Sequence, residues 1–162
     1  MRKPLAALLL VLLTATAQAD DLVEIQRMQL GLAQAIAQAA VETCREQGYQ
    51  VSAVVVDRSA QPQVVLRDVL APAFTIQIAQ EKANAVILSG VASSAFRGNR
   101  QDIRMEMNHV DGILVLEGGL PIVAGGGLVG AVGVSGAPGG DKDEACAQAA
   151  LEQLQERLEF AE

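Results

Sequence analysis

The residue types best suited to hold a cofactor gather in the stretch RMEMNHVDG, residues 104–112. His109 is the one histidine of the chain, and Met105 and Met107 precede it by four and two residues. Histidine and methionine are both axial ligands of haem iron, and both also bind copper. The pattern predicts a cofactor or metal site at His109 with the two methionines. The alternative is a loop histidine beside methionines that fill gaps in a core.

Arginines accompany this stretch at Arg97, Arg100 and Arg104. A guanidinium group forms charge-assisted hydrogen bonds with carboxylates, which include the propionates of a haem. We therefore place Arg104 in the predicted cofactor site with His109. The alternative is that these arginines form a solvated basic surface.

Lys82 is a second candidate for chemistry, because it lies on the apolar side of an expected helix, between Ile78 and Val86. A lysine removed from water can act as a base or a nucleophile, since its pKa falls on burial. The more common arrangement has the stem against apolar surface and the ammonium in water. That second arrangement is the one expected here.

Acidic residues offer weaker candidates. Asp57 and Asp68 flank an expected hairpin and could pair for acid–base work, but aspartate is ordinary in turns. An E-x-x-E spacing on the last helix could hold iron, although a solvated helix face explains it as well. The residues of that face are Glu152, Glu156, Glu159 and Glu162.

The two cysteines, Cys44 and Cys146, lie on the first and the last expected helices, each on the core-facing side. If these helices pack side by side, a disulfide can form, provided that the Cα atoms come within about 7 Å. The alternative is two buried free thiols that behave as small hydrophobic residues.

Residues 118–136 read GGLPIVAGGGLVGAVGVSG and contain G-x-G-x-x-G at Gly125, Gly127 and Gly130. A dinucleotide site requires a helix directly after such a loop. Here the chain continues as LVGAVGVSG, which alternates like a strand. We predict two antiparallel strands joined by a glycine turn. Glycine inside the second strand predicts close approach by another chain segment or a ligand.

The elements that must position these residues follow from periodicity and turn signals. Consecutive hairpin-type runs favour an antiparallel sheet, so we predict one α+β domain with a five-stranded antiparallel sheet flanked by helices. The expected elements are a helix from about 24 to 47, strands at 50–57 and 64–70, a helix from Pro72 to about 89, an irregular or partly helical segment at 92–108, three strands between 113 and 135, and a helix from about 142 to 159 capped by Asp141.

The chain of 162 residues begins with a charged Arg2-Lys3 pair, an apolar run and the sequence Ala17-Gln18-Ala19. This pattern predicts a signal peptide over residues 1–19, cut after Ala19, and a domain over residues 20–162. We expect a periplasmic or secreted protein. The apolar run of this pattern is too short to span a bilayer, and no other stretch of the sequence approaches that length.

Composition excludes one class of partner. The net charge is −7, and it falls to about −9 once Arg2 and Lys3 are removed. With one tyrosine, three phenylalanines and no tryptophan, the chain has neither the basic patch nor the stacking rings of a nucleic-acid-binding protein. We therefore expect no nucleic-acid partner.

Three segments resemble the GlcG/HbpS family of haem-binding-like proteins. They are VSAVVVD at 51–57, TIQIAQEKANA at 75–85 and GGLPIVAGGGLVGAVGVSGAPGGDKDEACAQAAL at 118–151. The resemblance implies a profilin-like fold, assembly into homo-oligomers, and haem or iron as the ligand.

The resemblance and the His109 stretch together predict a haem- or tetrapyrrole-binding protein that serves as a carrier, store or sensor without catalysis. The alternative is an accessory subunit or enzyme that acts on a small organic acid, because the arginines, Lys82 and the glycine-lined strand could hold an anion. A third hypothesis is an assembly partner with no small ligand.

Overall fold

Four strands form the sheet, and most of them are built from the β-branched, apolar runs that favour strands. They are β1 (Ser52–Asp57), β2 (Pro62–Arg67), β3 (Gly119–Ala124) and β4 (Gly127–Ser135). They pair in the order β2-β1-β4-β3, and each pairing is antiparallel. The computed structural model describes residue 23 and residues 25–161.

The predicted signal peptide, with its cut after Ala19, lies outside the described residues. Within the described part of the chain, no helix has both the length and the hydropathy needed to cross a membrane.

The prediction of a fifth strand is wrong. Residues 113–117 form no strand and pair with none. The Leu114 amide donates to the Glu81 carbonyl, and the Val115 amide donates to the side chain of Asn108 at 2.9 Å. Because other partners satisfy these amides, the apolar run lies along a helix instead of joining the sheet.

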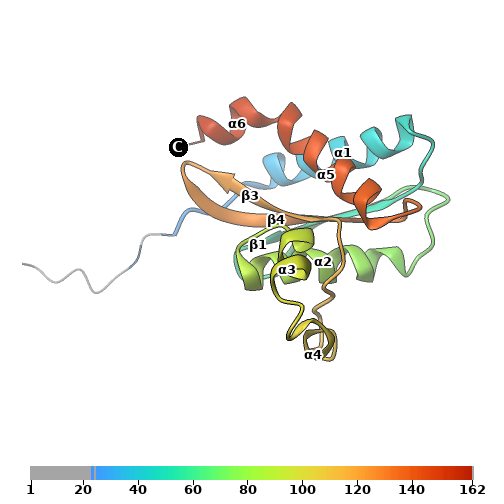
Figure 1. Ribbon diagram of the computed structural model, residues 1–162. Helices are drawn as coiled ribbons and strands as arrows, with labels where there is room; N and C mark the ends of the chain where they lie inside the picture. The colour runs from blue at the N-terminus through green and yellow to red at the C-terminus, as the bar shows by residue number, and fades with distance from the viewer. Residues whose placement is uncertain (1–22, 24, 162) are drawn as a thin grey trace, which may run out of the picture.

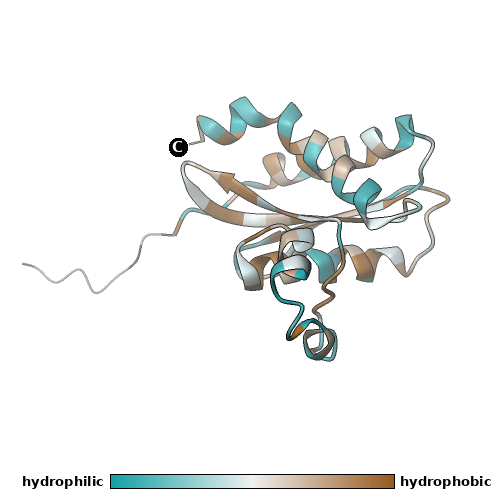
Figure 2. Cartoon of the chain, viewed as in Figure 1, coloured by the Kyte–Doolittle hydropathy of each residue, from teal (hydrophilic) through white to brown (hydrophobic). Residues whose placement is uncertain are grey.

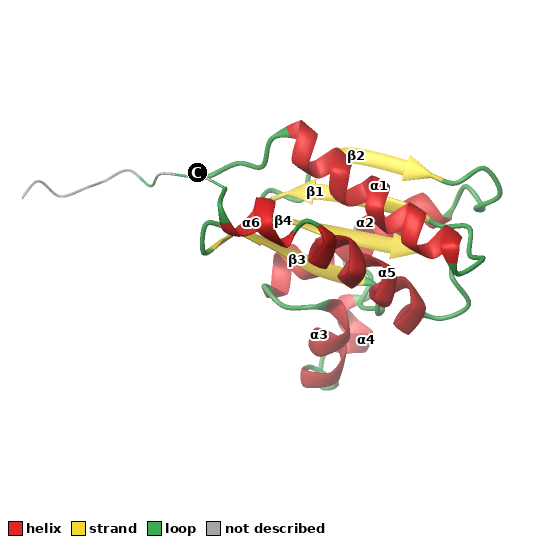
Figure 3. Ribbon diagram, turned by 90° about the horizontal axis from the view of Figure 1, so that it is seen from above, coloured by secondary structure: helices red, strands yellow, loops and turns green. Residues whose placement is uncertain are grey.

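Helices cover both faces of the sheet (Figures 1 and 3). On one face lie α1 (Leu30–Glu46), α5 (Gly140–Gln153) and α6 (Gln155–Glu159). The opposite face is covered by α2 (Thr75–Ser89), and α3 (Ser93–Asn99) and α4 (Arg104–Met107) follow on that side. Figure 1 shows α4 as the part of the chain farthest from the sheet on that side.

The strand β1 divides its apolar side chains between the two faces, as its uninterrupted apolar run predicts. Ala53 and Val55 pack in the larger cluster under α1 and α5, whereas Val54 and Val56 pack against α2. Figure 2 shows hydrophobic residues along the strands between the helical layers. The core is therefore two apolar layers with the sheet between them.

The glycine run forms the predicted hairpin. Gly125 and Gly126 both have positive φ angles, of 55° and 79°, which is the conformation of a type I′ turn. A strand and no helix follows Gly127, so the run is not a dinucleotide loop. At Gly133 a Cβ atom would overlap the Ala79 carbonyl of α2. The close approach predicted for this strand is made by a helix of the same chain.

The first helix begins later than the predicted start near residue 24, at Leu30. The last helix is interrupted at Leu154 and so forms α5 and α6. The prediction of Asp141 as the cap of α5 is wrong: Gly139 occupies that position, and Asp141 lies in the first turn.

A disulfide joins α1 to α5. Cys44 and Cys146 are both fully buried, and their Cα atoms are 5.4 Å apart. Their separation of 102 residues links the first helix of the domain to the helix that follows the last strand. The bridge therefore closes most of the domain into one covalent loop.

Candidate functional site

A hollow of about 480 Å³ lies between the end of α2, α3 and α4. Most of its wall is apolar, and one thioether and one guanidinium face it. The apolar lining residues are Leu88, Val91, Phe96, Ile103 and Met107, and the polar ones are Ser89, Asn99 and Arg100. Phe96 and Met107 also pack with Val115 in a small outer cluster, which holds this segment against α2.

The predicted cofactor ligands are not all gathered at this hollow. Met107 lines it, but Met105, His109 and Arg104 do not. Met105 is 64% exposed on α4, and His109 is exposed after its end. The structure therefore brings one of the four predicted residues to this hollow, and the other three are not part of its wall.

The chemistry of the hollow fits a tetrapyrrole. Apolar walls suit a flat macrocycle, methionine sulfur is an axial ligand of haem iron, and arginine pairs with propionates. The Arg100 guanidinium already forms two hydrogen bonds with Asp102, of 3.0 and 3.1 Å. Both side chains are about half exposed or more, so a propionate could compete for this guanidinium.

The expectation that the Lys82 ammonium reaches water is wrong. Lys82 is 3% exposed, and its Nζ donates to Asp143 Oδ2 at 2.7 Å and to the Val134 carbonyl at 3.0 Å. Asp143, at the start of α5, is also 3% exposed. Figure 1 shows α2 and α5 on opposite sides of the sheet, so this ion pair joins the two helical layers past the end of β4.

Glycine makes room for this ion pair. A Cβ atom at Gly118 would come within 2.8 Å of both Lys82 Nζ and Asp143 Cβ, and one at Gly119 would come within 2.6 Å of the Lys82 carbonyl. A side chain at either position would displace the lysine or the helix that carries it. The pair Gly118-Gly119 is therefore part of the structure that buries Lys82.

Hydrogen bonds fix the surrounding backbone. Asp143 Oδ1 accepts from the Ala137 amide at 2.9 Å, and Glu144 Oε2 accepts from the Gly118 amide at 3.1 Å. The Ser93 hydroxyl accepts from the Gly119 amide at 2.9 Å. These bonds tie the start of α3 and the start of α5 to the residues that precede β3.

Burial raises the pKa of Asp143 above the ordinary range of an aspartate, against the opposing effect of Lys82. Removal of a carboxylate from water disfavours its charged form, and a nearby cation favours it. The lysine is therefore the partner that makes an ionised Asp143 tolerable in this position.

A second hollow, of about 450 Å³, opens beside this ion pair. We call it the Lys82 cleft. It is enclosed by the start of α2, the segment before β3, the end of β4 and the glycine-rich loop that leads into α5. Its wall includes Pro72, Phe74, Thr75, Ile78, Lys82, Arg97, Leu116, Glu117, Ser135 and Asp143, together with residues 136–140.

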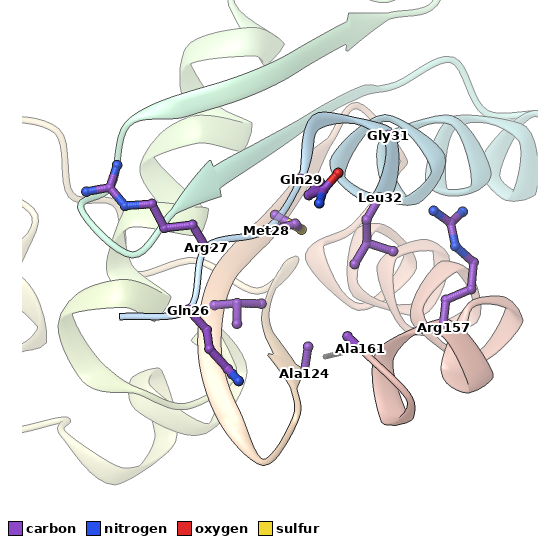
Figure 4. Close-up of a pocket in the computed structure, with 10 residues that line it drawn as sticks. Gln26, Arg27, Met28, Gln29, Gly31, Leu32, Ala124, Arg157 and Ala161 are labelled. Atoms are coloured by element: carbon purple, nitrogen blue, oxygen red, sulfur yellow. The ribbon is translucent and has the colours of Figure 1, made fainter. Parts of the chain in front are cut away.

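A third hollow, of about 360 Å³, lies where the chain enters α1 (Figure 4). Arg27 and Arg157 lie on opposite sides of it, with Met28 and Ala124 between them. Both arginines are exposed. No charged side chain of its wall is buried, so it has weaker features of a binding site than the Lys82 cleft.

The acidic candidates serve local structure. Asp57 Oδ1 accepts the amides of Ser59 and Gln61 in the β1–β2 turn, and Asp68 accepts from Arg45 at 2.8 Å. Within residues 25–161, no three His, Cys, Asp or Glu side chains lie close enough to hold a metal ion. Glu162, the last of the predicted iron-binding glutamates, lies outside the described residues.

The family model described as "Haem degrading protein HbpS-like" matches residues 28–152. The chain belongs to the HbpS-like family. A crystal structure of HbpS is 33% identical, with a TM-score of 0.77, over 85% of this chain and 97% of that one. A double mutant of Streptomyces reticuli HbpS is 32% identical, also with a TM-score of 0.77, over 93% and 99% of the two chains.

Two further structures share the fold of this HbpS-like chain. Klebsiella pneumoniae protein ORFY is 25% identical, with a TM-score of 0.77, over 85% of this chain and 97% of that one. PduOC, solved as a haem complex, is 22% identical with a TM-score of 0.71, over 78% and 94% of the two chains. No curated protein sequence matches the chain.

The family match and the HbpS and ORFY structures confirm the resemblance to the GlcG/HbpS family.

Sequence reasoning missed Asp143, Glu144 and Ser135 as parts of a site. Asp141 followed by Glu144 is typical of a helix cap, so the sequence predicts only a capping role for this stretch. One signal could have pointed to Asp143, namely a lysine on an apolar helix face, which requires a buried acceptor somewhere else in the chain. The sequence does not show which acceptor this is.

Proposed function

We propose that this protein binds haem or a related tetrapyrrole in the hollow between α2, α3 and α4, as a periplasmic or secreted carrier, store or sensor. The observation that supports it most is the apolar hollow that contains Met107 and Arg100 in a member of the HbpS-like family. The haem complex of a protein with the same fold adds support.

Met107 would hold the iron from the wall of the hollow, and Arg100 would exchange Asp102 for a propionate. The bound group would supply redox chemistry, whereas the chain supplies an apolar wall that excludes water and one ligand at the iron. His109 stays a second candidate ligand, from outside the hollow.

Titration of the mature protein, from Asp20 onward, with hemin tests this function. A shifted Soret band that saturates at one hemin per chain is expected. Met107→Leu preserves the volume of the side chain and should weaken or shift the band, while Met105→Leu is the matched control and should not. The absence of any Soret shift would overturn the function. A band that is lost only in His109→Ala would move the ligand to His109.

We also propose that the protein binds haem without degrading it. The complex should keep its Soret band when it is incubated with ascorbate and oxygen. Loss of the band with release of iron, in the presence of catalase and faster than for free hemin, would show that the protein degrades haem and is an enzyme.

The location of the protein is inferred from two features. The signal-peptide pattern predicts export, and the disulfide between Cys44 and Cys146 suits an oxidising compartment. Mass spectrometry of the protein from a periplasmic extract should find Asp20 as the first residue. A full-length chain in the cytosolic fraction would contradict export.

A further inference from the structure

We propose that the Lys82 cleft is a second binding site, for a small carboxylate with an apolar or aromatic body. The cleft and the proposed haem hollow share no lining residue. The proposal is therefore independent of haem binding.

The first observation is a hydroxyl in the wall of the cleft that bonds to no protein group. Ser135, the last residue of β4, is 5% exposed and lines the cleft. Among the described residues, none forms a hydrogen bond with its side chain, although the neighbouring Ser52 hydroxyl is bonded to Thr75 at 2.7 Å. The Ser135 hydroxyl is therefore free to donate a hydrogen bond to a ligand in the cleft.

The start of α5 adds further donors. The amides of Gly139, Gly140 and Asp141 donate to no acceptor among the described residues, as is usual for the first turn of a helix. Gly139 and Gly140 form part of the wall. The N-terminal end of a helix carries a partial positive charge and favours an anion.

The two carboxylates of the cleft, in contrast, already have cationic partners. Asp143 uses both carboxylate oxygens, one for Lys82 and one for the Ala137 amide. Glu117 Oε1 accepts from Arg97 at 2.9 Å. A site with free donors and paired carboxylates favours a ligand that brings acceptors of its own, such as a carboxylate.

Arg97 is the cation that such a ligand can reach. Its ion pair with Glu117 lies at the mouth of the cleft, with the two side chains 40% and 32% exposed. A pair this exposed contributes little to stability, so a ligand carboxylate can replace Glu117 at low cost. Lys82 and Asp143 stay paired behind it and together carry no net charge.

The residues at the rim of the Lys82 cleft indicate what the part of the ligand beyond its carboxylate should be. Phe74 is largely exposed, and Leu116 and Ile78 lie beside it in the same wall. Apolar surface next to a set of donors suits a molecule with a carboxylate at one end and a ring or short alkyl chain at the other.

Calorimetric titration and thermal-shift measurements with benzoate test the proposal, and benzamide serves as an uncharged probe of nearly the same shape. Benzoate at millimolar concentration should bind and raise the melting temperature, and benzamide should do neither. Ser135→Ala and Arg97→Gln should each weaken benzoate binding by about tenfold, since hydrogen bonds to a charged group contribute strongly. Arg100→Gln, which alters the hollow between α2, α3 and α4, is the matched control and should leave benzoate binding unchanged.

The variant Glu117→Gln tests whether Arg97 binds the ligand or only stabilises the fold. The variant removes the side chain that competes for Arg97, so benzoate should bind more tightly than to the parent protein. The proposal would be overturned if benzamide raised the melting temperature as much as benzoate does. It would also be overturned if Ser135→Ala and Arg97→Gln both bound benzoate with the affinity of the parent protein. Hemin should titrate equally well in these two variants, so that failure at one site is distinguished from failure at the other.

Discussion

The two faces of the sheet are held by different physical means. Under α1 and α5 lies the larger apolar cluster, and the disulfide between Cys44 and Cys146 runs through it. On the other face, α2 lies directly against Gly133, and Lys82 reaches past the end of the sheet to Asp143. Both candidate ligand sites have α2 in their walls.

This difference indicates a division of roles. The apolar layer closed by the covalent bridge needs no polar partner, and the hollow at its edge has only exposed charged side chains, Arg27 and Arg157, in its wall. The α2 layer contains a buried charge, and around that charge the chain leaves space and free donors. We therefore expect stability to depend on both faces and ligand binding to depend on the α2 face.

The largest effect is expected from Asp143→Ala. It leaves the Lys82 ammonium buried with only the Val134 carbonyl as its partner. Loss of one member of a buried ion pair typically costs about 3–5 kcal/mol. The free energy of unfolding, measured by urea denaturation of the mature protein, should fall by this amount.

The control is the double variant Lys82→Met with Asp143→Leu. It removes both charges and should recover most of the loss, because a well-packed apolar pair can replace a buried ion pair. If Asp143→Ala unfolds like the parent protein, the ion pair does not hold the α2 face.

A smaller effect is expected on the other face, from Cys44→Ala with Cys146→Ala. The bridge spans 102 residues, and removal of a cross-link that restricts the unfolded chain typically costs about 2–4 kcal/mol. The melting temperature should fall, while benzoate and hemin titrations of the folded variant should match those of the parent. Loss of binding together with the bridge would contradict the separation of the two faces.

The smallest effect is expected from Gly31→Ala, because no atom lies within 4 Å of the added Cβ and alanine favours a helix by up to about 1 kcal/mol over glycine. Gly133→Ala is the contrasting variant. Its methyl group would overlap the Ala79 carbonyl of α2, and overpacking against backbone costs about 3 kcal/mol or more. Urea denaturation should show opposite signs for the two variants, and equal signs would mean that α2 does not pack on β4 as described.

Much of the fold could be predicted from local sequence patterns. The hairpin at Gly125–Gly126 and the division of β1 between two faces follow from turn chemistry and apolar runs, which depend on neighbouring residues. The prediction of a fifth strand at 113–117 is wrong because the pattern behind it is equally local. An apolar run becomes a strand only if the edge of a sheet accepts its backbone hydrogen bonds. Here the Glu81 carbonyl and the Asn108 side chain take its amides.

The candidate site could be predicted only in part. Residue type pointed to Met105, Met107 and His109, but exposure separates them, and of the three only Met107 lines the hollow between α2, α3 and α4. The helical spacing of Lys82 correctly placed it on an apolar face. Whether the ammonium of such a lysine reaches water depends on the groups that surround it in the folded protein. The position of the lysine along its helix does not indicate which groups these are.

The sequence by itself determined the elements whose causes lie within a few residues: the amphipathic helices, the alternating strands and the glycine turn. Only the tertiary structure decided that Lys82 meets Asp143, 61 residues away, and that Ser135 lines the Lys82 cleft. The physical reason is that burial and pairing of polar groups depend on which segments meet in space. A local pattern sets the side of an element that faces inward, but the groups it meets there come from other parts of the chain.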